Sequence, residues 1–229
     1  MSKPVYVLVH GAWGGAWCWE KLTEDLDARG ASWRTLDLPS SKIGADPGSD
    51  LAVDASVVAE VANDVEGPVV LVGHSYAGSV ITEAAPQVHG LEGLFYIAAT
   101  VPEIGQSHSD NARVVRVRTA MDEAILLDGP LLRLDLDAAA LALYQDCSLE
   151  LREWAKARLS VQTLASFRGA RTSPDVDVPK RYVLCTHDHA LDATLQEVVS
   201  RGCDQVVRLE SDHSPFLSHS AQLSDILLG

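Results

Sequence analysis

A serine in this sequence stands where a catalytic nucleophile could be held. Ser75 follows the apolar run Val69-Val70-Leu71-Val72 and lies in the segment Gly73-His74-Ser75-Tyr76-Ala77-Gly78. A strand that runs into a sharp turn and then a helix forms a nucleophile elbow, which needs small residues two positions before and after the nucleophile. Gly73 and Ala77 meet that need, although the usual motif has glycine at both positions. The alternative interpretation is that Ser75 only caps the following helix.

A serine hydroxyl is a weak nucleophile, so this interpretation requires a general base and a group that orients the base. His213 is the candidate base, because it follows an expected late strand, Gln205–Leu209, and precedes a final helix. Asp188 is the preferred orienting acid, because it follows another expected strand, Arg181–Cys185. The chain order serine, acid, histidine is that of hydrolases with such an elbow. Other acids near strand ends remain as alternatives: Asp192, Asp212 and Glu103. A helix N-cap is the structural alternative for Asp188 itself.

Attack by serine also requires backbone N–H groups that stabilise the oxyanion. One donor should be the N–H of Tyr76, directly after the nucleophile. The second should come from the loop His10-Gly11-Ala12-Trp13-Gly14-Gly15, and we select the N–H of Ala12. Taken alone, this loop could be a plain tight turn.

Several residues near these motifs are candidates for substrate binding: Gly11, Trp13, His74 and Phe216. We expect the rings of Trp13, Tyr76 and Phe216 to flank the reacting carbon, which favours apolar or aromatic acyl groups. Trp17 and Trp19 are expected to pack the first helix onto the sheet. A metal site built from His187, His189 and His213 lacks a matching carboxylate pattern, so we expect no metal and no other cofactor.

The elements that must position these residues alternate between short β-branched runs and longer segments of helical period. This pattern is typical of an α/β fold with a mostly parallel sheet and helices on both faces. Six strands are expected: Val5–Val9, Ser32–Leu36, Pro68–Val72, Gly93–Ala98, Arg181–Cys185 and Gln205–Leu209. Helices are expected at Trp17–Arg29 and Ser49–Val65.

The alternation stops in the middle of the chain. We therefore divide it into a core, residues 1–105 and 178–229, and an inserted helical cap, residues 106–177. Leu136–Tyr144 and Glu150–Leu164 are its expected helices, and no strand is predicted there. Because insertions above the carboxyl ends of parallel strands surround the ligand, we expect the cap to set substrate specificity.

Composition excludes several classes of protein. The 229 residues suffice for one domain, with 47% hydrophobic and 22% charged residues. The formal net charge of −14 disfavours nucleic acid and anionic membranes as partners. The apolar run Val5–Val9 is too short for a signal peptide or a membrane span, so a cytoplasmic location is expected. Four scattered cysteines predict packed thiols rather than disulfides. Whether the chain forms a homodimer stays open.

Three segments resemble one branch of the α/β-hydrolases: His10–Trp19, Gly73–Gly78 and Ser211-Asp212-His213. That branch holds the plant methylesterases, the hydroxynitrile lyases and bacterial esterase relatives. The resemblance covers roughly residues 4–105 and 178–229, and no motif in the cap matches. It implies the α/β-hydrolase fold with a shortened, six-stranded sheet, and it puts Asp188 at the acid position of the family.

Two positions favour the esterase side of this branch. The lyases carry threonine after the first-strand histidine and lysine after the triad histidine, where this chain has Gly11 and Ser214. We therefore expect a serine hydrolase that cleaves a small carboxylic ester or lactone through an acyl-enzyme intermediate. Two alternatives remain: a lyase of the hydroxynitrile lyase type that uses the same triad to cleave a C–C bond, and a non-catalytic protein that binds a small ligand on the same fold.

Overall fold

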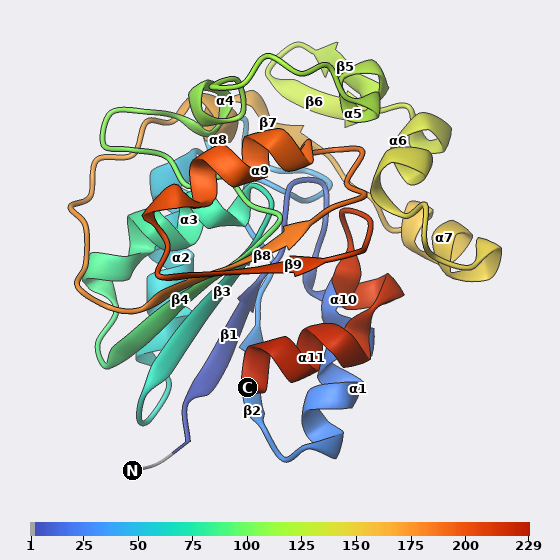
Figure 1. Ribbon diagram of the computed structural model, residues 1–229. Helices are drawn as coiled ribbons and strands as arrows, with labels where there is room; N and C mark the ends of the chain where they lie inside the picture. Colours follow the sequence, from blue (N-terminus) through green and yellow to red (C-terminus); the bar gives the residue numbers. More distant parts are fainter. Residues whose placement is uncertain (1–2) are drawn as a thin grey trace.

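The computed structural model describes residues 3–229 and is built around a parallel sheet in the order β2-β1-β3-β4-β8-β9 (Figure 1). Its strands are β1 (Val5–Val9), β2 (Ser32–Thr35), β3 (Val69–His74), β4 (Leu91–Ile97), β8 (Lys180–Cys185) and β9 (Gln205–Leu209). Every neighbouring pair is parallel. The six expected strands and the α/β-hydrolase fold are therefore confirmed.

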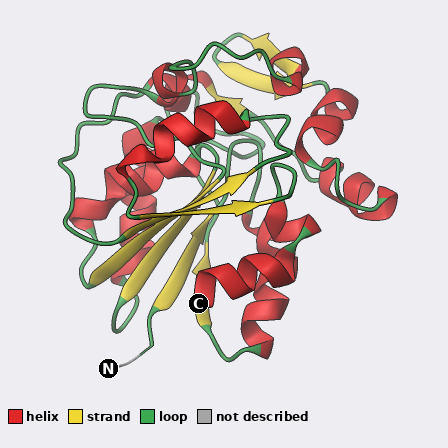
Figure 2. Ribbon diagram, viewed as in Figure 1, coloured by secondary structure: helices red, strands yellow, loops and turns green. Residues whose placement is uncertain are grey.

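Helices cover both faces of this sheet (Figure 2). On one face α1 (Glu20–Ala28) packs against α11 (Ser220–Leu228), and on the other α2 (Leu51–Asn63) packs against α3 (Ala77–Ala84). The two expected helices thus form, the first of them split into a short 3-10 turn and α1. The remaining core helices are η1 (Ala16–Trp19), η2 (Ala85–Gln87), α9 (Ala193–Val199), η3 (Ser200–Gly202) and α10 (Pro215–Ser218).

The strands β1 and β3, which both lie inside the sheet, have apolar sequences without alternation. A strand covered by helices on both faces has no side that meets water, so consecutive residues must all be apolar. Val7, Leu8 and Val9 in β1 are fully buried, and so are Leu71 and Val72 in β3. This double burial fixes the end of β3, and with it the position of the residue that follows.

The elements from α4 (His108–Asn111) to α8 (Leu164–Arg168), which we call the cap, lie beyond the carboxyl ends of the parallel strands (Figure 1). The cap helices are α4, α5 (Ala120–Ala124), α6 (Leu136–Leu143), α7 (Leu149–Lys156) and α8. An isolated antiparallel bridge between Ser107 and Ala170 joins the two ends of the cap.

The expectation of a purely helical cap was wrong. The cap contains an antiparallel sheet of three strands, β5 (Ile125–Asp128), β6 (Leu131–Leu134) and β7 (Gln162–Thr163). A turn at Gly129, with φ +56°, joins β5 to β6. The second expected helix also ends early, at Lys156 instead of Leu164. Four-residue strands rich in leucine carry too little periodicity to be told from helix.

The helices of residues 3–229 include none with both the length and the apolar character that a bilayer span requires.

Candidate active site

The elbow expected at Ser75 is present between β3 and α3. Ser75 has φ +54°, a left-handed conformation that is costly for a residue with a side chain and that tends to persist where function requires it. Three backbone hydrogen bonds hold it: its N–H donates to the carbonyl of Ile97, and its own carbonyl accepts from Gly78 and Thr100. All residues from Leu71 to Ala85 are buried except Ser75, which is partly exposed.

Small residues around Ser75 are required by close backbone contacts. A Cβ added to Gly73 would lie 2.7 Å from the carbonyl oxygen of Ala77. One added to Gly78 would lie 2.3 Å from the carbonyl oxygen of Thr100. The turn therefore admits the methyl group of Ala77 and needs glycine at the next position, which explains the departure from the usual motif.

Asp188 and His213 form a buried pair. The Nδ1 atom of His213 lies 2.6 Å from Oδ2 of Asp188. The other carboxylate oxygen, Oδ1, accepts the N–H groups of Ala190 at 2.7 Å and Leu191 at 2.8 Å. These two bonds lock the carboxylate in one orientation, with Oδ2 facing the imidazole. The carboxylate thus selects the tautomer in which His213 Nδ1 carries the proton, leaving Nε2 free as an acceptor.

Gln196 supports this pair and was not foreseen from the sequence. It is fully buried on α9, and its Nε2 donates to Oδ2 of Asp188 at 2.9 Å. Its Oε1 accepts the N–H of Cys185 at 3.0 Å, so the amide cannot turn over without breaking that bond. No helix was predicted over Ala193–Val199, and the role of Gln196 depends on its contacts with Cys185 and Asp188, so the sequence carried no signal for it.

None of the alternative acids is hydrogen-bonded to His213. Asp192 caps α9 through the N–H of Thr194, and Glu103 is exposed. Asp212, the direct neighbour of His213, accepts instead from the N–H of Ser214 and the hydroxyl of Ser218.

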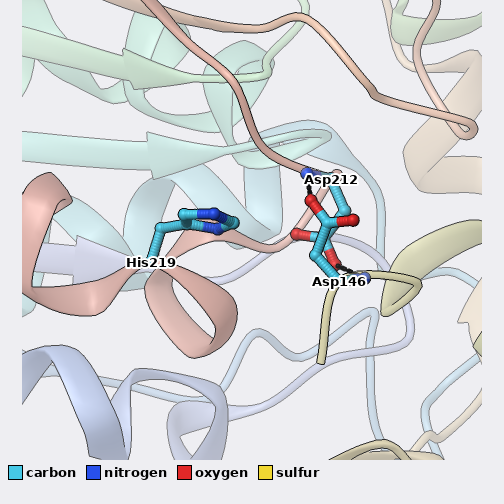
Figure 3. Close-up of side chains that lie close together, drawn as sticks. All are labelled: Asp146, Asp212 and His219. Atoms are coloured by element: carbon cyan, nitrogen blue, oxygen red, sulfur yellow. Dashed lines mark hydrogen bonds between the residues drawn. The ribbon is translucent and has the colours of Figure 1, made fainter. Parts of the chain in front are cut away.

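Asp212 also takes part in a reciprocal contact with the cap. Its Oδ2 accepts the N–H of Asp146 at 3.1 Å, and its own N–H donates to Oδ2 of Asp146 at 2.8 Å (Figure 3). His219 lies beside them, with one possible ligand atom from each of the three within 4.8 Å of the others. Through these hydrogen bonds the two carboxylates connect the cap to the loop that carries His213.

His74 contributes to the same loop. Its Nε2 donates to the backbone carbonyl of His213 at 2.9 Å. Burial, reinforced by the neighbouring His213, holds the pKa of His74 well below its usual range, so the ring is neutral. His74 was expected to bind substrate; it does face the cavity described below, but its hydrogen bond also positions the base.

The loop after β1 lies directly beside the elbow. A Cβ on Gly11 would be 2.7 Å from Nδ1 of His74 and 3.0 Å from Cβ of Ser75, so only glycine fits there. Burial lowers the pKa of His10, whose neutral ring is 2.8 Å from the carbonyl of Gly11 and accepts the N–H of Leu38 at 3.0 Å.

Two backbone donors near Ser75 have no acceptor in the protein. Among residues 3–229, neither the N–H of Ala12 nor that of Tyr76 forms a hydrogen bond to another residue. The hydroxyl of Ser75 likewise has no hydrogen-bonding partner within this part of the chain. Unsatisfied donors beside a free hydroxyl are the arrangement that oxyanion stabilisation requires.

These groups open into one cavity of about 630 Å³. Of the expected site residues, Asp188 and Tyr76 are not part of the cavity lining. The others line it: Gly11, Ala12, Trp13, His74, Ser75, His213 and Phe216. The apolar part of the wall comes largely from the cap: Met121, Ile125, Leu132, Leu143, Leu164 and Phe167. A cavity of this size and lining suits a small organic ligand.

The expectation that the ring of Tyr76 flanks the reacting carbon was wrong. Tyr76 is fully buried, and its hydroxyl donates to Oδ2 of Asp54 at 2.7 Å, away from the cavity. Tyr76 is the N-cap of α3, and its side chain is held toward α2 by the bond to Asp54. Only its N–H stays beside Ser75.

His108 is a cavity residue that the sequence did not single out. Its Nδ1 lies 3.0 Å from the hydroxyl of Thr100, and its ring packs on Phe167 with centroids 4.2 Å apart. Burial lowers the pKa of His108 to about 3, so the ring is a neutral hydrogen-bonding group in the wall.

The sequence matches the alpha/beta hydrolase family over residues 6–226. It is 28% identical to norfluorocurarine synthase 2 of Strychnos, covering 97% of this chain and 93% of that protein. It is 27% identical to polyneuridine aldehyde esterase of Rauvolfia serpentina, covering 97% and 94%. The crystal structure of the Arabidopsis methylesterase MES16 superposes with a TM-score of 0.81 at 26% identity, covering 98% and 97%. The expected resemblance to the plant methylesterase branch is confirmed.

Proposed function

The chain belongs to the alpha/beta hydrolase family, and from that premise we propose that it is a serine esterase that cleaves small carboxylic esters or lactones. One observation carries the proposal. His213, which is paired with the buried carboxylate of Asp188 at 2.6 Å, lines the same cavity as Ser75, whose hydroxyl is engaged by no described residue. The relatives named as esterases support the same reaction class.

In the proposed reaction the hydroxyl of Ser75 attacks the ester carbonyl while Nε2 of His213 removes its proton. The N–H groups of Ala12 and Tyr76 stabilise the oxyanion of the tetrahedral intermediate. The bond between the carbonyl carbon and the alkoxide oxygen then breaks, His213 gives its proton to the departing alkoxide to form the alcohol, and the acyl group stays bound to Ser75. A water molecule, deprotonated by the same imidazole, releases the carboxylic acid and restores the serine.

Asp188 keeps its negative charge throughout. It holds the imidazole in the reactive tautomer and stabilises the imidazolium that forms in each half-reaction. The fixed donors Ala190, Leu191 and Gln196 keep this carboxylate in place, so the pair needs no rearrangement when charge develops.

The test is loss of hydrolysis of activated short-chain aryl esters in Ser75→Ala. We expect kcat/KM to fall by at least about a thousandfold, because triad residues act as a unit. Ser56→Ala, at an exposed position on α2, is the matched control and should keep full activity. A sulfonyl fluoride should label the unaltered protein at Ser75, as read by peptide mass spectrometry. Labelling of another residue would overturn the assignment.

The lyase alternative makes an opposite prediction. A lyase must stabilise departing cyanide, yet Ser214 provides no cation beside His213, and the chain as a whole is strongly negative. We therefore expect no cyanide release from an aromatic cyanohydrin above the uncatalysed rate. Cyanide release that Ser75→Ala abolishes, with no activity on any ester or lactone, would put the lyase first. A non-catalytic ligand-binding protein would show neither activity.

A further inference from the structure

The lining of the cavity includes a group of exposed positive charges. Between α4 and α5 the chain crosses the end of the molecule that lies beyond the sheet (Figure 1). Three exposed arginines of this segment line the cavity: Arg113, Arg116 and Arg118. We refer to these three residues as the arginine rim.

The arginine rim contrasts with the rest of the protein. The chain has 18 Lys and Arg against 32 Asp and Glu, so a random patch of surface would be acidic. Mutual repulsion of three cations within six residues is unfavourable unless anions offset it. Arg118 lies 3.4 Å from Glu123, but in the described part of the chain no acidic oxygen lies within 4 Å of a guanidinium nitrogen of Arg113 or Arg116.

The two acidic residues that line the cavity form hydrogen bonds with groups other than the arginines. Asp122 accepts from the N–H and hydroxyl of Thr119 at the start of α5, and Asp192 caps α9. Neither is paired with the arginine rim. Two exposed arginines without an acidic partner therefore line the same cavity as Ser75 and the apolar side chains of the cap.

We propose that the substrate is an ester with a free carboxylate at the end remote from the scissile bond, and that Arg113 and Arg116 bind this carboxylate. The inference rests on the proposed esterase function. The planar guanidinium offers paired donors that match a carboxylate, and the apolar wall accommodates the spacer between the two ends. The local positive charge also counters the negative field that the whole chain would impose on an anionic substrate.

The experiment compares mono-p-nitrophenyl esters of dicarboxylic acids with p-nitrophenyl alkanoates of the same chain length, across a series of lengths. We expect the anionic esters to have the lower KM once the spacer is long enough to reach the rim. Raising the ionic strength should reduce this preference, because salt screens exposed pairs.

Variants then assign the preference to the rim. Each exposed ion pair contributes about 0.2–1 kcal/mol, so Arg113→Gln and Arg116→Gln together should lower kcat/KM for the anionic esters by about two- to thirtyfold through KM. The neutral esters should change by less than about twofold, which separates charge recognition from a general defect. Arg201→Gln, at an exposed position in η3 away from the cavity, is the matched control and should change neither series.

A binding measurement separates this inference from the function on which it rests. By calorimetry, suberate should bind the unaltered protein more tightly than octanoate, and the double variant should lose the difference. Hydrolysis of both ester series at equal KM, or a preference that survives the double variant, would overturn the inference and leave the esterase function intact. Preferential binding of suberate without hydrolysis of any ester would support carboxylate binding and overturn the esterase function.

Discussion

Replacing Asp188 by asparagine tests the proposed site more sharply than removing the side chain, because the variant keeps the volume and changes one atom. Oδ1 of Asp188 accepts two backbone N–H groups, from Ala190 and Leu191. An amide must keep its oxygen there, since its NH₂ group cannot accept. The NH₂ is thereby forced into the position of Oδ2, opposite Nδ1 of His213 and Nε2 of Gln196.

This forced orientation has two consequences. The asparagine NH₂ donates to Nδ1 of His213, so the proton of the neutral imidazole moves to Nε2 and the ring can no longer accept the serine proton. The same change in serine proteases lowers kcat by about 10⁴, and we expect a loss of that order. The NH₂ also faces Nε2 of Gln196, which keeps the carbonyls of Leu191 and Cys185 as acceptors and loses only its hydrogen bond to Asp188. Loss of one hydrogen bond to a charged group costs about 1.5–3 kcal/mol of folding stability.

The assay is kcat for an activated aryl ester, with urea unfolding to measure stability and circular dichroism to verify the fold. Asp50→Asn is the control, because it makes the same chemical change at the N-cap of α2, where asparagine caps as well as aspartate. A folded Asp188→Asn protein with kcat within about tenfold of the unaltered protein would refute the tautomer argument. The acid role would then pass to Asp212 or Glu103.

Two further predictions concern stability. Gly78→Ala should lower the free energy of unfolding by at least about 1–3 kcal/mol, because the new methyl group meets the backbone of Thr100; Gly202→Ala, with nothing within 4 Å of the added Cβ, should change it little. Burial raises the pKa of Asp54 above its unfolded value, so its ionisation opposes folding and stability is lost as pH rises through the raised pKa. The stability of the unaltered protein relative to Asp54→Asn, measured by urea unfolding, should therefore be greater at acid pH than at neutral pH. A difference that grows with pH would contradict the burial argument.

The sheet could be predicted because its strands are buried on both faces. Double burial forces uninterrupted apolar runs such as Val5–Val9, and the glycines around Ser75 mark the close approach of strand and helix. Those constraints act on neighbouring residues in the chain, so the sequence pattern alone indicates them. The sequence predicted the pairing of Asp188 with His213 only from their order along the chain and their places after strands. The structure shows the contact itself.

What escaped prediction depends on contacts between distant segments. Gln196 acts through Cys185 and Asp188, and nothing in its own helix indicates that a buried amide is required there. The side chain of Tyr76 is held away from the cavity by Asp54, a residue of another helix. Strand β7 has two residues and exists only as a partner of β6.

The cap contacts both loops that carry proposed catalytic groups, so substrate specificity and catalysis are coupled in this protein. The cap holds Trp13, next to the proposed oxyanion donor Ala12, by three hydrogen bonds: the indole N–H donates to Leu132, the backbone N–H to Gln162, and the backbone carbonyl accepts from Ser160.

At the other side of the cavity, Asp146 of the cap clasps Asp212 beside the base. The same insertion carries the arginine rim. An anionic substrate bound to Arg113 and Arg116 would therefore contact the cap, which holds both the loop after β1 and the loop that carries His213. Binding energy gained at the rim could then be expressed in kcat as well as in KM, which is how remote contacts contribute to catalysis when they help to organise the reacting groups.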